Sequence, residues 1–494
     1  MEESHNIKKL KDEDEDAMIK LIHKVMREKS NSWIEWCQLI ATICIPVIIV
    51  TYTIIQDRQN LHEANMSRES ESQIAEGKRL NELLIAEENR QKDRDLAKDQ
   101  QWENILVEYH RFLSGLLIER SLSVFAPLLP RLRDEDKMAI LLMTYNALNQ
   151  LDPKRKRHVI RALYEYKLIA IKINTQLKDV SILDVGKIDL SNVVLGSVYD
   201  SQSLQSRTFL IDWYYLRLPG AIFRNASMRH AALDCVNLSA TNFDSADLSF
   251  AFTGSLKCSN RTPISPTTFK QSSFVNSSFY YANFYAIDFY GSNFMFANMF
   301  YLQCKGCNFE KSILIGTNLS SSVISSEYAS KQPATFRLVK LSYATVDLSI
   351  FQSLTFDYSD WSHVQAKQIR MINCTFVNAT MINASFVKGS LSNVLFQQTD
   401  LSYIDMTYAI LKNISFIDTI MYYANLSYIK CEYCNFINID LRNSLLRNAS
   451  LLYSNFVNCS IDEKQVGEII DLGGSKLPNE TIVQNNNQRI NFYD

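Results

Sequence analysis

A period of five residues in the second part of the chain limits the fold more than any other feature. From Leu183 onward a large apolar residue recurs at every fifth position, termed position i, and the residue at i−2 is small or short. The longest unbroken run extends from Phe336 to Ile461. A fixed period over such a length predicts stacked repeats that form a solenoid. An earlier run at position i comprises Phe223, Met228, Leu233, Leu238, Phe243 and Leu248.

The composition supports this prediction. The 494 residues include 26 Phe and 24 Tyr but only 13 Gly and 9 Pro, and Asn and Ser are concentrated in the second half. A globular enzyme of this size needs more glycine for its turns. A solenoid whose corners are supplied by repeated Asn, Asp and Ser does not.

The repeats, such as ATFRL, ASFVK, TDLSY, ANLSY and ASLLY, resemble the pentapeptide-repeat family, whose signature is A-(D/N)-L-x-x. The resemblance implies a mainly β fold, a right-handed quadrilateral β-helix with four pentapeptides per coil. Positions i and i−2 would point inward, and i−1, i+1 and i+2 would face solvent. The β-helix is expected over 181–461, with insertions near 196–212, 254–268 and 325–335. A C-terminal cap and tail are expected over 462–494, because an open coil end would expose the core.

A transmembrane helix is predicted over 33–56, after a charged N-terminal segment, 1–32. Residues 36–56 carry no charge, and about 20 such residues span a bilayer core. A buried core helix would show a polar face, and a signal peptide would start nearer the N-terminus. Lys20, Lys24, Arg27 and Lys29 precede the span, whereas Arg58 and Arg68 follow it. This bias favours a cytosolic N-terminus, but the apparently free cysteines favour the opposite orientation, so the side stays open.

A polar helical stalk is predicted over 57–101, and a small helical domain over 102–180. The leucines of the stalk are too sparse for a sustained heptad pattern, so a solvated helix fits better than a coiled coil. In the domain, Asp152 and Pro153 predict an N-cap and a first-turn proline. The basic run 154–157 is expected to be solvated or to contact an anionic headgroup or acidic partner.

Ten cysteines are widely spaced, which differs from a disulfide-rich secreted domain and predicts mostly free thiols. Two C-x-x-C pairs, Cys304/Cys307 and Cys431/Cys434, occupy an i position and the following i−2 position. They lie too many coils apart to share a metal, and we interpret them as small core residues. No cofactor, metal site or catalytic motif is expected.

Outward aromatic residues suggest an interaction surface. Residues 20 apart stack on one side of such a solenoid, as in Tyr280 over Phe300 and Tyr281 over Tyr301. The alternative is that these rings only stabilise neighbouring strands. The candidate interaction surface consists of Tyr280, Tyr281, Tyr285, Tyr290, Phe296, Phe300 and Tyr301.

The function expected from these features is a membrane-tethered, non-catalytic interaction or scaffolding module. Its partners would be membrane lipid through residues 36–56, an unknown protein, and another copy of the chain. The net charge is −2, with roughly two dozen charges of each sign in the repeats, so nucleic acid is not an expected partner. DNA mimicry against a topoisomerase, or carbohydrate or ice binding, is the alternative.

Overall fold

The computed structural model describes residues 33–119, 133–166, 168–169, 183, 185–195, 216–253, 267–326 and 334–478. Two compact units make up the chain, Met1–Lys98 and Asp99–Asp494. The predicted charged segment and nearly all of the three predicted insertions lie outside the described residues.

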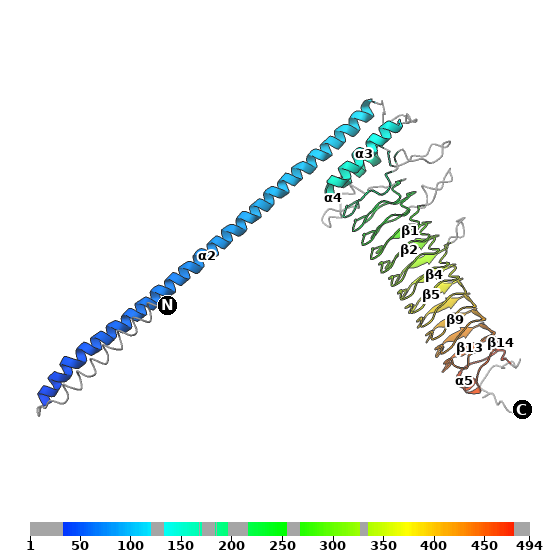
Figure 1. The fold of residues 1–494 in the computed structure, drawn as a ribbon. Helices are drawn as coiled ribbons and strands as arrows, with labels where there is room; N and C mark the ends of the chain where they lie inside the picture. Colours follow the sequence, from blue (N-terminus) through cyan, green and yellow to red (C-terminus); the bar gives the residue numbers. More distant parts are fainter. Residues whose placement is uncertain are drawn as a thin grey trace, which may run out of the picture. The chain divides into compact units, whose positions relative to one another are not determined.

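One helix, α2, extends without interruption over Trp33–Glu119 and contains Pro46 (Figure 1). The predicted span, the stalk and the first helix of the helical domain are therefore one element. By length and composition this helix can cross a membrane, and none of its most apolar stretch is buried. Core helices and signal sequences can meet the same criterion, so the anchor stays a prediction.

Two shorter helices follow, α3 (Asp134–Gln150) and α4 (Pro153–Glu165). The predicted N-cap of α4 is confirmed, because the Asp152 carboxylate accepts a hydrogen bond of 3.2 Å from the Lys154 amide and Pro153 opens the helix. The helices bury a shared apolar core with the end of α2. This core includes Tyr109, Leu113, Ile140, Leu148, Val159 and Leu163.

Two cations in the basic run of α4, Arg155 and Lys156, have partners within the protein, whereas Lys154 is exposed. Arg155 forms ion pairs with Asp99, Glu103 and Asp152 at 3.2, 2.9 and 3.1 Å, and these carboxylates raise its pKa. The Lys156 ammonium donates a 3.0 Å hydrogen bond to the carbonyl of Asp189. Four cations at a helix N-terminus oppose the helix dipole, and these acceptors offset that cost.

The repeats form a β-solenoid in which every pairing is parallel (Figure 1). Each coil has four sides, and each side pairs with the same side of the next coil in a parallel ladder. The sides are numbered in chain order and are identified by these pairings: Asp288↔Asn308 (side 1), Asn293↔Ile313 (side 2), Ser278↔Asn298 (side 3) and Asn283↔Gln303 (side 4). Side 1 contains β6 (Thr375–Val377), β8 (Leu395–Gln397), β10 (Ser415–Ile417), β12 (Asn435–Ile437) and β14 (Asn455–Val457). Side 4 contains β1 (Asn283–Tyr285), β2 (Gln303–Lys305), β3 (Val323–Ser325), β4 (Ile350–Gln352), β5 (Arg370–Ile372), β7 (Ser390–Ser392), β9 (Ile410–Lys412), β11 (Lys430–Glu432) and β13 (Ser450–Leu452).

The ladders stay in register across the predicted insertions. Asn237 pairs with Thr268, and Asn308 pairs with Thr335, so side 1 resumes after each interruption. The stack of coils therefore continues as one solenoid on both sides of these segments.

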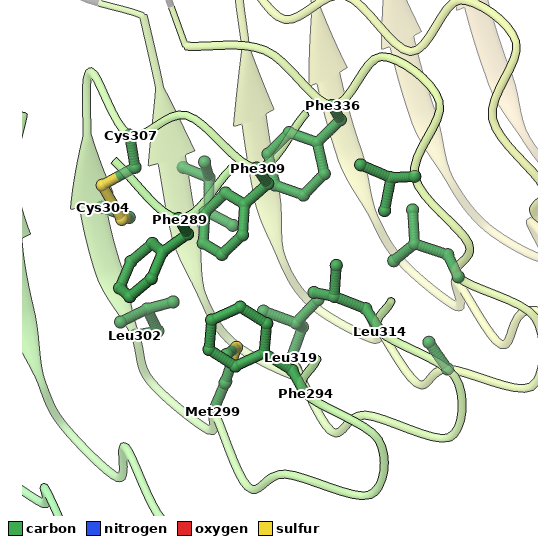
Figure 2. Close-up of a cluster of buried hydrophobic side chains, with 14 of the residues drawn as sticks. Phe289, Phe294, Met299, Leu302, Cys304, Cys307, Phe309, Leu314, Leu319 and Phe336 are labelled. Carbon is green, nitrogen blue, oxygen red and sulfur yellow. A yellow bond between two sulfur atoms is a disulfide. The ribbon is translucent and has the colours of Figure 1, made fainter. Parts of the chain in front are cut away.

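Inward positions i and i−2 fill the solenoid, as the repeat predicts. Phe376, Phe396, Phe416 and Phe436 stack in one column with ring centroids 5.1 to 5.2 Å apart. Figure 2 shows Phe289, Phe309 and Phe336 continuing this arrangement in earlier coils, beside the sulfur–sulfur bond of Cys304 and Cys307. Burial of these rings contributes strongly to the apolar core, together with the buried Leu, Ile, Val and Met side chains.

The corners depend on a feature that the sequence interpretation missed. Position i+2 has a positive φ in coil after coil, for example +54° at Asn225 and +55° at Tyr281. At many corners the amide three residues after i donates to the carbonyl of residue i, as from Ala226 to Phe223 at 3.0 Å. A turn of this kind needs a left-handed residue at its third position. Asn tolerates that conformation, which explains why Asn is frequent at position i+2.

Both ends of the described solenoid are covered. The Tyr145 hydroxyl of α3 donates to the carbonyl of Gly186 in the first coil, and Arg217 donates its amide to the carbonyl of Ile169 at 3.0 Å. At the other end, helix α5 (Glu463–Glu468) contains Gln465. The side-chain amide of Gln465 donates to the backbone carbonyls of Leu441 and Ser444 at 2.6 and 2.7 Å. These contacts pair backbone carbonyl and amide groups that an open coil would leave unpaired.

The expectation of mostly free thiols is wrong. Disulfides join Cys304 to Cys307 and Cys431 to Cys434, and Cys235 is also disulfide-bonded. The Cα atoms within the two pairs are 5.9 and 6.0 Å apart, a separation that suits a disulfide. Inward positions on either side of one corner face each other, so these pairs are cross-links and not simple core residues. The described free cysteines are Cys37, Cys44, Cys374 and Cys459.

Candidate functional site

A group of five aromatic rings lies along the corner between sides 3 and 4, and is termed the aromatic cluster. Tyr280 stacks on Phe300 at 5.9 Å between ring centroids, and Tyr281 stacks on Tyr301 at 4.6 Å. Within each coil the adjacent rings meet edge to face, Tyr280 with Tyr281 and Phe300 with Tyr301, both at 4.6 Å. Phe250 completes the group, with its ring 5.7 Å from Tyr280 and 5.8 Å from Tyr281.

The structure brings together four of the seven predicted surface residues: Tyr280, Tyr281, Phe300 and Tyr301. The other three lie at different corners, because Tyr285 follows the side 4 ladder, Tyr290 follows side 1, and Phe296 follows side 2. Residues five apart in sequence are one full side apart on the coil. A continuous surface of all seven residues is therefore excluded, and the four-residue part stays a prediction.

Phe250 belongs to the cluster although the sequence interpretation did not include it. It occupies position i+2 of side 3, as Tyr281 and Tyr301 do. The interruption after Thr253 lengthens the sequence separation between Phe250 and Tyr281 beyond 20 residues, so counting by 20 does not find Phe250. The pairing of Phe252 with Asn283 restores the alignment. His230 continues the stack, 4.8 Å from Phe250, and the Arg229 guanidinium lies 5.4 Å from the same ring. Desolvation and Arg229 lower the pKa of His230, which favours its neutral form.

The outer rings of the cluster are accessible. Tyr281 is 43% exposed and Tyr301 is 42% exposed, whereas Tyr280 and Phe300 are half-buried beneath them. Desolvation, with added contributions from Tyr280 and Tyr301, raises the pKa of Tyr281, so its hydroxyl stays neutral at physiological pH. The surface therefore presents uncharged rings with hydroxyl groups, a combination that suits protein contacts.

Stacked rings also occur at other corners of the described coils. Tyr343 stacks on His363 at 4.7 Å, and Tyr433 stacks on Tyr453 at 5.2 Å. These two are single columns. At another corner Tyr422 meets Tyr423 edge to face at 4.2 Å, and Tyr403 lies 5.4 Å from Tyr423. The aromatic cluster has two stacked columns in contact. Position i+2 is left-handed at each ring of the two single columns, a conformation that costs about 1 kcal/mol or more for a bulky residue. Stacking between coils offsets that cost.

Other described features do not point to chemistry. Among the residues that the structure describes, no group of three or more His, Cys, Asp or Glu could hold a metal ion. The side-chain amide of Asn393 donates at 3.0 Å to the side-chain oxygen Oδ1 of Asn373. In the next coil the side-chain amide of Asn413 donates at 3.1 Å to Oδ1 of Asn393. This ladder links neighbouring coils and is a structural feature.

Comparison with known proteins identifies the repeat. A family model described as pentapeptide repeats matches eight copies, over residues 220–252 and 424–461. The β-solenoid is built from pentapeptide repeats. No curated protein matches the sequence significantly.

Several solved structures are similar to parts of this chain. One is trypsin-treated QnrB1, a plasmid-mediated fluoroquinolone resistance protein, at 16% identity and a TM-score of 0.25, covering 46% of this chain and 93% of that one. Another is HetL, a pentapeptide repeat protein involved in heterocyst differentiation regulation from Nostoc sp. strain PCC 7120, at 13% identity and a TM-score of 0.20, covering 60% and 92%. The catalytic unit of an α-1,3-glucanase from Streptomyces thermodiastaticus has 7% identity and a TM-score of 0.25, covering 59% and 61%. At these identities and TM-scores the similarities carry no argument about this chain.

Proposed function

We propose that this protein is a non-catalytic interaction module, tethered to a membrane through residues 36–56, whose β-solenoid binds a protein partner through the aromatic cluster. The observation that supports the site most directly is the pair of adjacent columns at one corner, with Tyr281 and Tyr301 both more than 40% exposed. Exposed aromatic groups in contact with each other are typical of binding surfaces, and aromatic anchors dominate interface energetics.

The solenoid supplies a rigid support for such a surface. Backbone hydrogen bonds hold the main chain of the cluster, as from the Tyr281 amide to the Phe300 carbonyl at 3.0 Å and from the Tyr301 amide to the Ser320 carbonyl at 3.1 Å. Stacking between the rings limits their rotation. Rings held in this way lose little conformational entropy on binding. The near-neutral charge of the repeats disfavours DNA mimicry, which depends on an acidic surface.

Replacement of both outer rings tests the site. The double variant Tyr281→Asn, Tyr301→Asn removes the rings but keeps a residue that tolerates a positive φ. The matched control is Tyr433→Asn, Tyr453→Asn, which removes a stacked pair of similar exposure at the same repeat position on another corner. Partners are identified by proximity labelling in native membranes, and binding of the isolated partner or of a second copy is then measured.

The cluster variant should weaken binding at least about tenfold, which corresponds to about 1.4 kcal/mol. The control should bind normally, and both variants should lose similar, small amounts of thermal stability, a few tenths of a kcal/mol per ring pair. Unchanged binding by the cluster variant, together with a loss of stability, would show that the rings only brace adjacent coils.

A further inference from the structure

The two disulfides occupy equivalent places in the solenoid. Cys304 and Cys431 are at position i of side 4, and Cys307 and Cys434 are at the following position i−2 of side 1. All four residues are at most 1% exposed. Each bond therefore crosses the inside of the corner between sides 4 and 1, in coils well separated along the stack.

The residues at this corner in other coils show why paired cysteines are significant. Position i of side 4 holds a large apolar residue in most other described coils, such as Phe284, Phe351, Leu391 or Leu411. A lone cysteine there would leave unfilled volume, which is costly in a packed core. In the described coils, cysteine occupies this position only where a second cysteine follows three residues later. A covalent bridge fills the corner that a large side chain fills in the neighbouring coils.

Cys374 is an internal comparison for these pairs. It occupies the same i−2 position of side 1, but Met371 stands at the preceding position i, so it has no cysteine opposite and is free. Burial raises the pKa of its thiol to about 11, which makes the thiolate scarce and the group unreactive.

Disulfides form and persist in oxidising compartments, whereas the cytosol keeps thiols reduced. Each bond requires the two-electron oxidation of two thiols, with release of two protons. The electrons pass by thiol–disulfide exchange to a protein disulfide of the oxidative folding machinery, which becomes a dithiol. The disulfides of the solenoid, including that of Cys235, therefore place its folding outside the cytosol.

The charges beside the apolar segment lead to the same orientation. Lys20, Lys24, Arg27 and Lys29 precede residues 36–56, and fewer cations follow closely. Cytosolic flanks carry the excess of Lys and Arg, so the N-terminus lies in the cytosol and the chain after residue 56 lies on the other side. Of the described solenoid cysteines that opposed this orientation in the sequence, Cys374 and Cys459 are free. The others, Cys235, Cys304, Cys307, Cys431 and Cys434, are disulfide-bonded.

We infer that the β-solenoid is an extracytoplasmic domain, cross-linked at Cys304–Cys307 and Cys431–Cys434, and joined through the span to a cytosolic N-terminal segment. The inference rests on the proposed tether. It also narrows the proposed partner to a protein, or another copy of this chain, on the extracytoplasmic side.

Differential alkylation tests the disulfides. Full-length protein from native membranes is denatured in one alkylating reagent, reduced, treated with a second reagent, and digested for mass spectrometry. Cys304, Cys307, Cys431 and Cys434 should carry the second label, and Cys374 should carry the first. Labelling of the two pairs by the first reagent to the same extent as Cys374 would overturn the inference.

Labelling of single introduced cysteines tests the orientation. Lys412→Cys adds a thiol at an exposed position of β9, and Lys24→Cys adds one before the span. When only the plasma membrane is opened, a membrane-impermeant maleimide should react at position 24 from the cytosol. Position 412 should react either in intact cells or only after every membrane is opened.

Reaction of both positions in the cytosolic step would overturn the extracytoplasmic assignment. Alkaline carbonate extraction of the same variants separates the causes. Release of the full-length chain into the supernatant would mean that the tether itself is wrong, whereas retention in the membrane pellet would mean that only the orientation is wrong.

Discussion

The stacked phenylalanine column allows a sharp test of the inward positions. Phe396 is fully buried, and its ring stacks between Phe376 and Phe416 at 5.1 Å from each. Phe→Ala substitutions in cores cost about 3–5 kcal/mol through the transfer and cavity terms. Backbone bonds hold the coils on both sides at fixed spacing, for example from Gln398 to Ile417 at 2.9 Å. The cavity cannot collapse, so we expect Phe396→Ala to cost about 4–5 kcal/mol.

Amide hydrogen exchange measured by mass spectrometry reports this loss locally, which suits a solenoid whose coils contact only their neighbours. A cost of about 4 kcal/mol corresponds to about a thousandfold loss of protection in β8 and β10. The matched control is Gln397→Ala, at the adjacent outward position, which should change stability by no more than about 0.5 kcal/mol. Similar losses of protection in the two variants would refute the assignment of inward and outward positions.

Two further predictions concern the helical domain and the corners. The Tyr109 hydroxyl pairs with Thr144 at 3.0 Å, so Tyr109→Phe should cost about 1–3 kcal/mol at neutral pH, measured by chemical denaturation. Burial raises the pKa of Tyr109 to about 12, above its unfolded value of 10.0, so its contribution is complete below pH 10 and is lost as pH rises towards 12. The native protein should therefore lose roughly 2–3 kcal/mol over that interval, and Tyr109→Phe should lack this component. At Asn393, where φ is +56°, Asn393→Ala should be less stable than Asn393→Gly by about 1 kcal/mol in thermal unfolding, and equal stabilities would contradict the left-handed corner.

Much of the fold follows from local rules and was predicted from the sequence. The period of five residues specifies which side chains point inward, because each repeat occupies one side of a coil regardless of what lies beyond its neighbours. Phe386 and Leu391, for example, are both at most 1% exposed, as their positions in the repeat require. Pentapeptide repeats and a β-solenoid are confirmed, and the N-cap at Asp152 needed only the local pair Asp152–Pro153.

The candidate site was predicted only in part, because it depends on how coils align. Tyr285 and Phe296 are close to Tyr281 in sequence but belong to other corners, whereas Phe250 is distant in sequence but adjacent in space. Counting by 20 residues finds Tyr281 over Tyr301, but it fails for Phe250, because an insertion changes the spacing to 31 residues.

The sequence by itself determined the repeat, the inward and outward positions, and the apolar segment 36–56, because each depends on neighbouring residues or on a fixed period. Only the tertiary structure decided which outward rings meet, which cations of α4 are paired, and that Cys304 and Cys431 are bonded to Cys307 and Cys434. The physical reason is that contacts between coils depend on register and on insertions, and a disulfide depends on two side chains facing each other across a corner. Both depend on distances between residues in the folded chain, and the sequence pattern does not specify those distances.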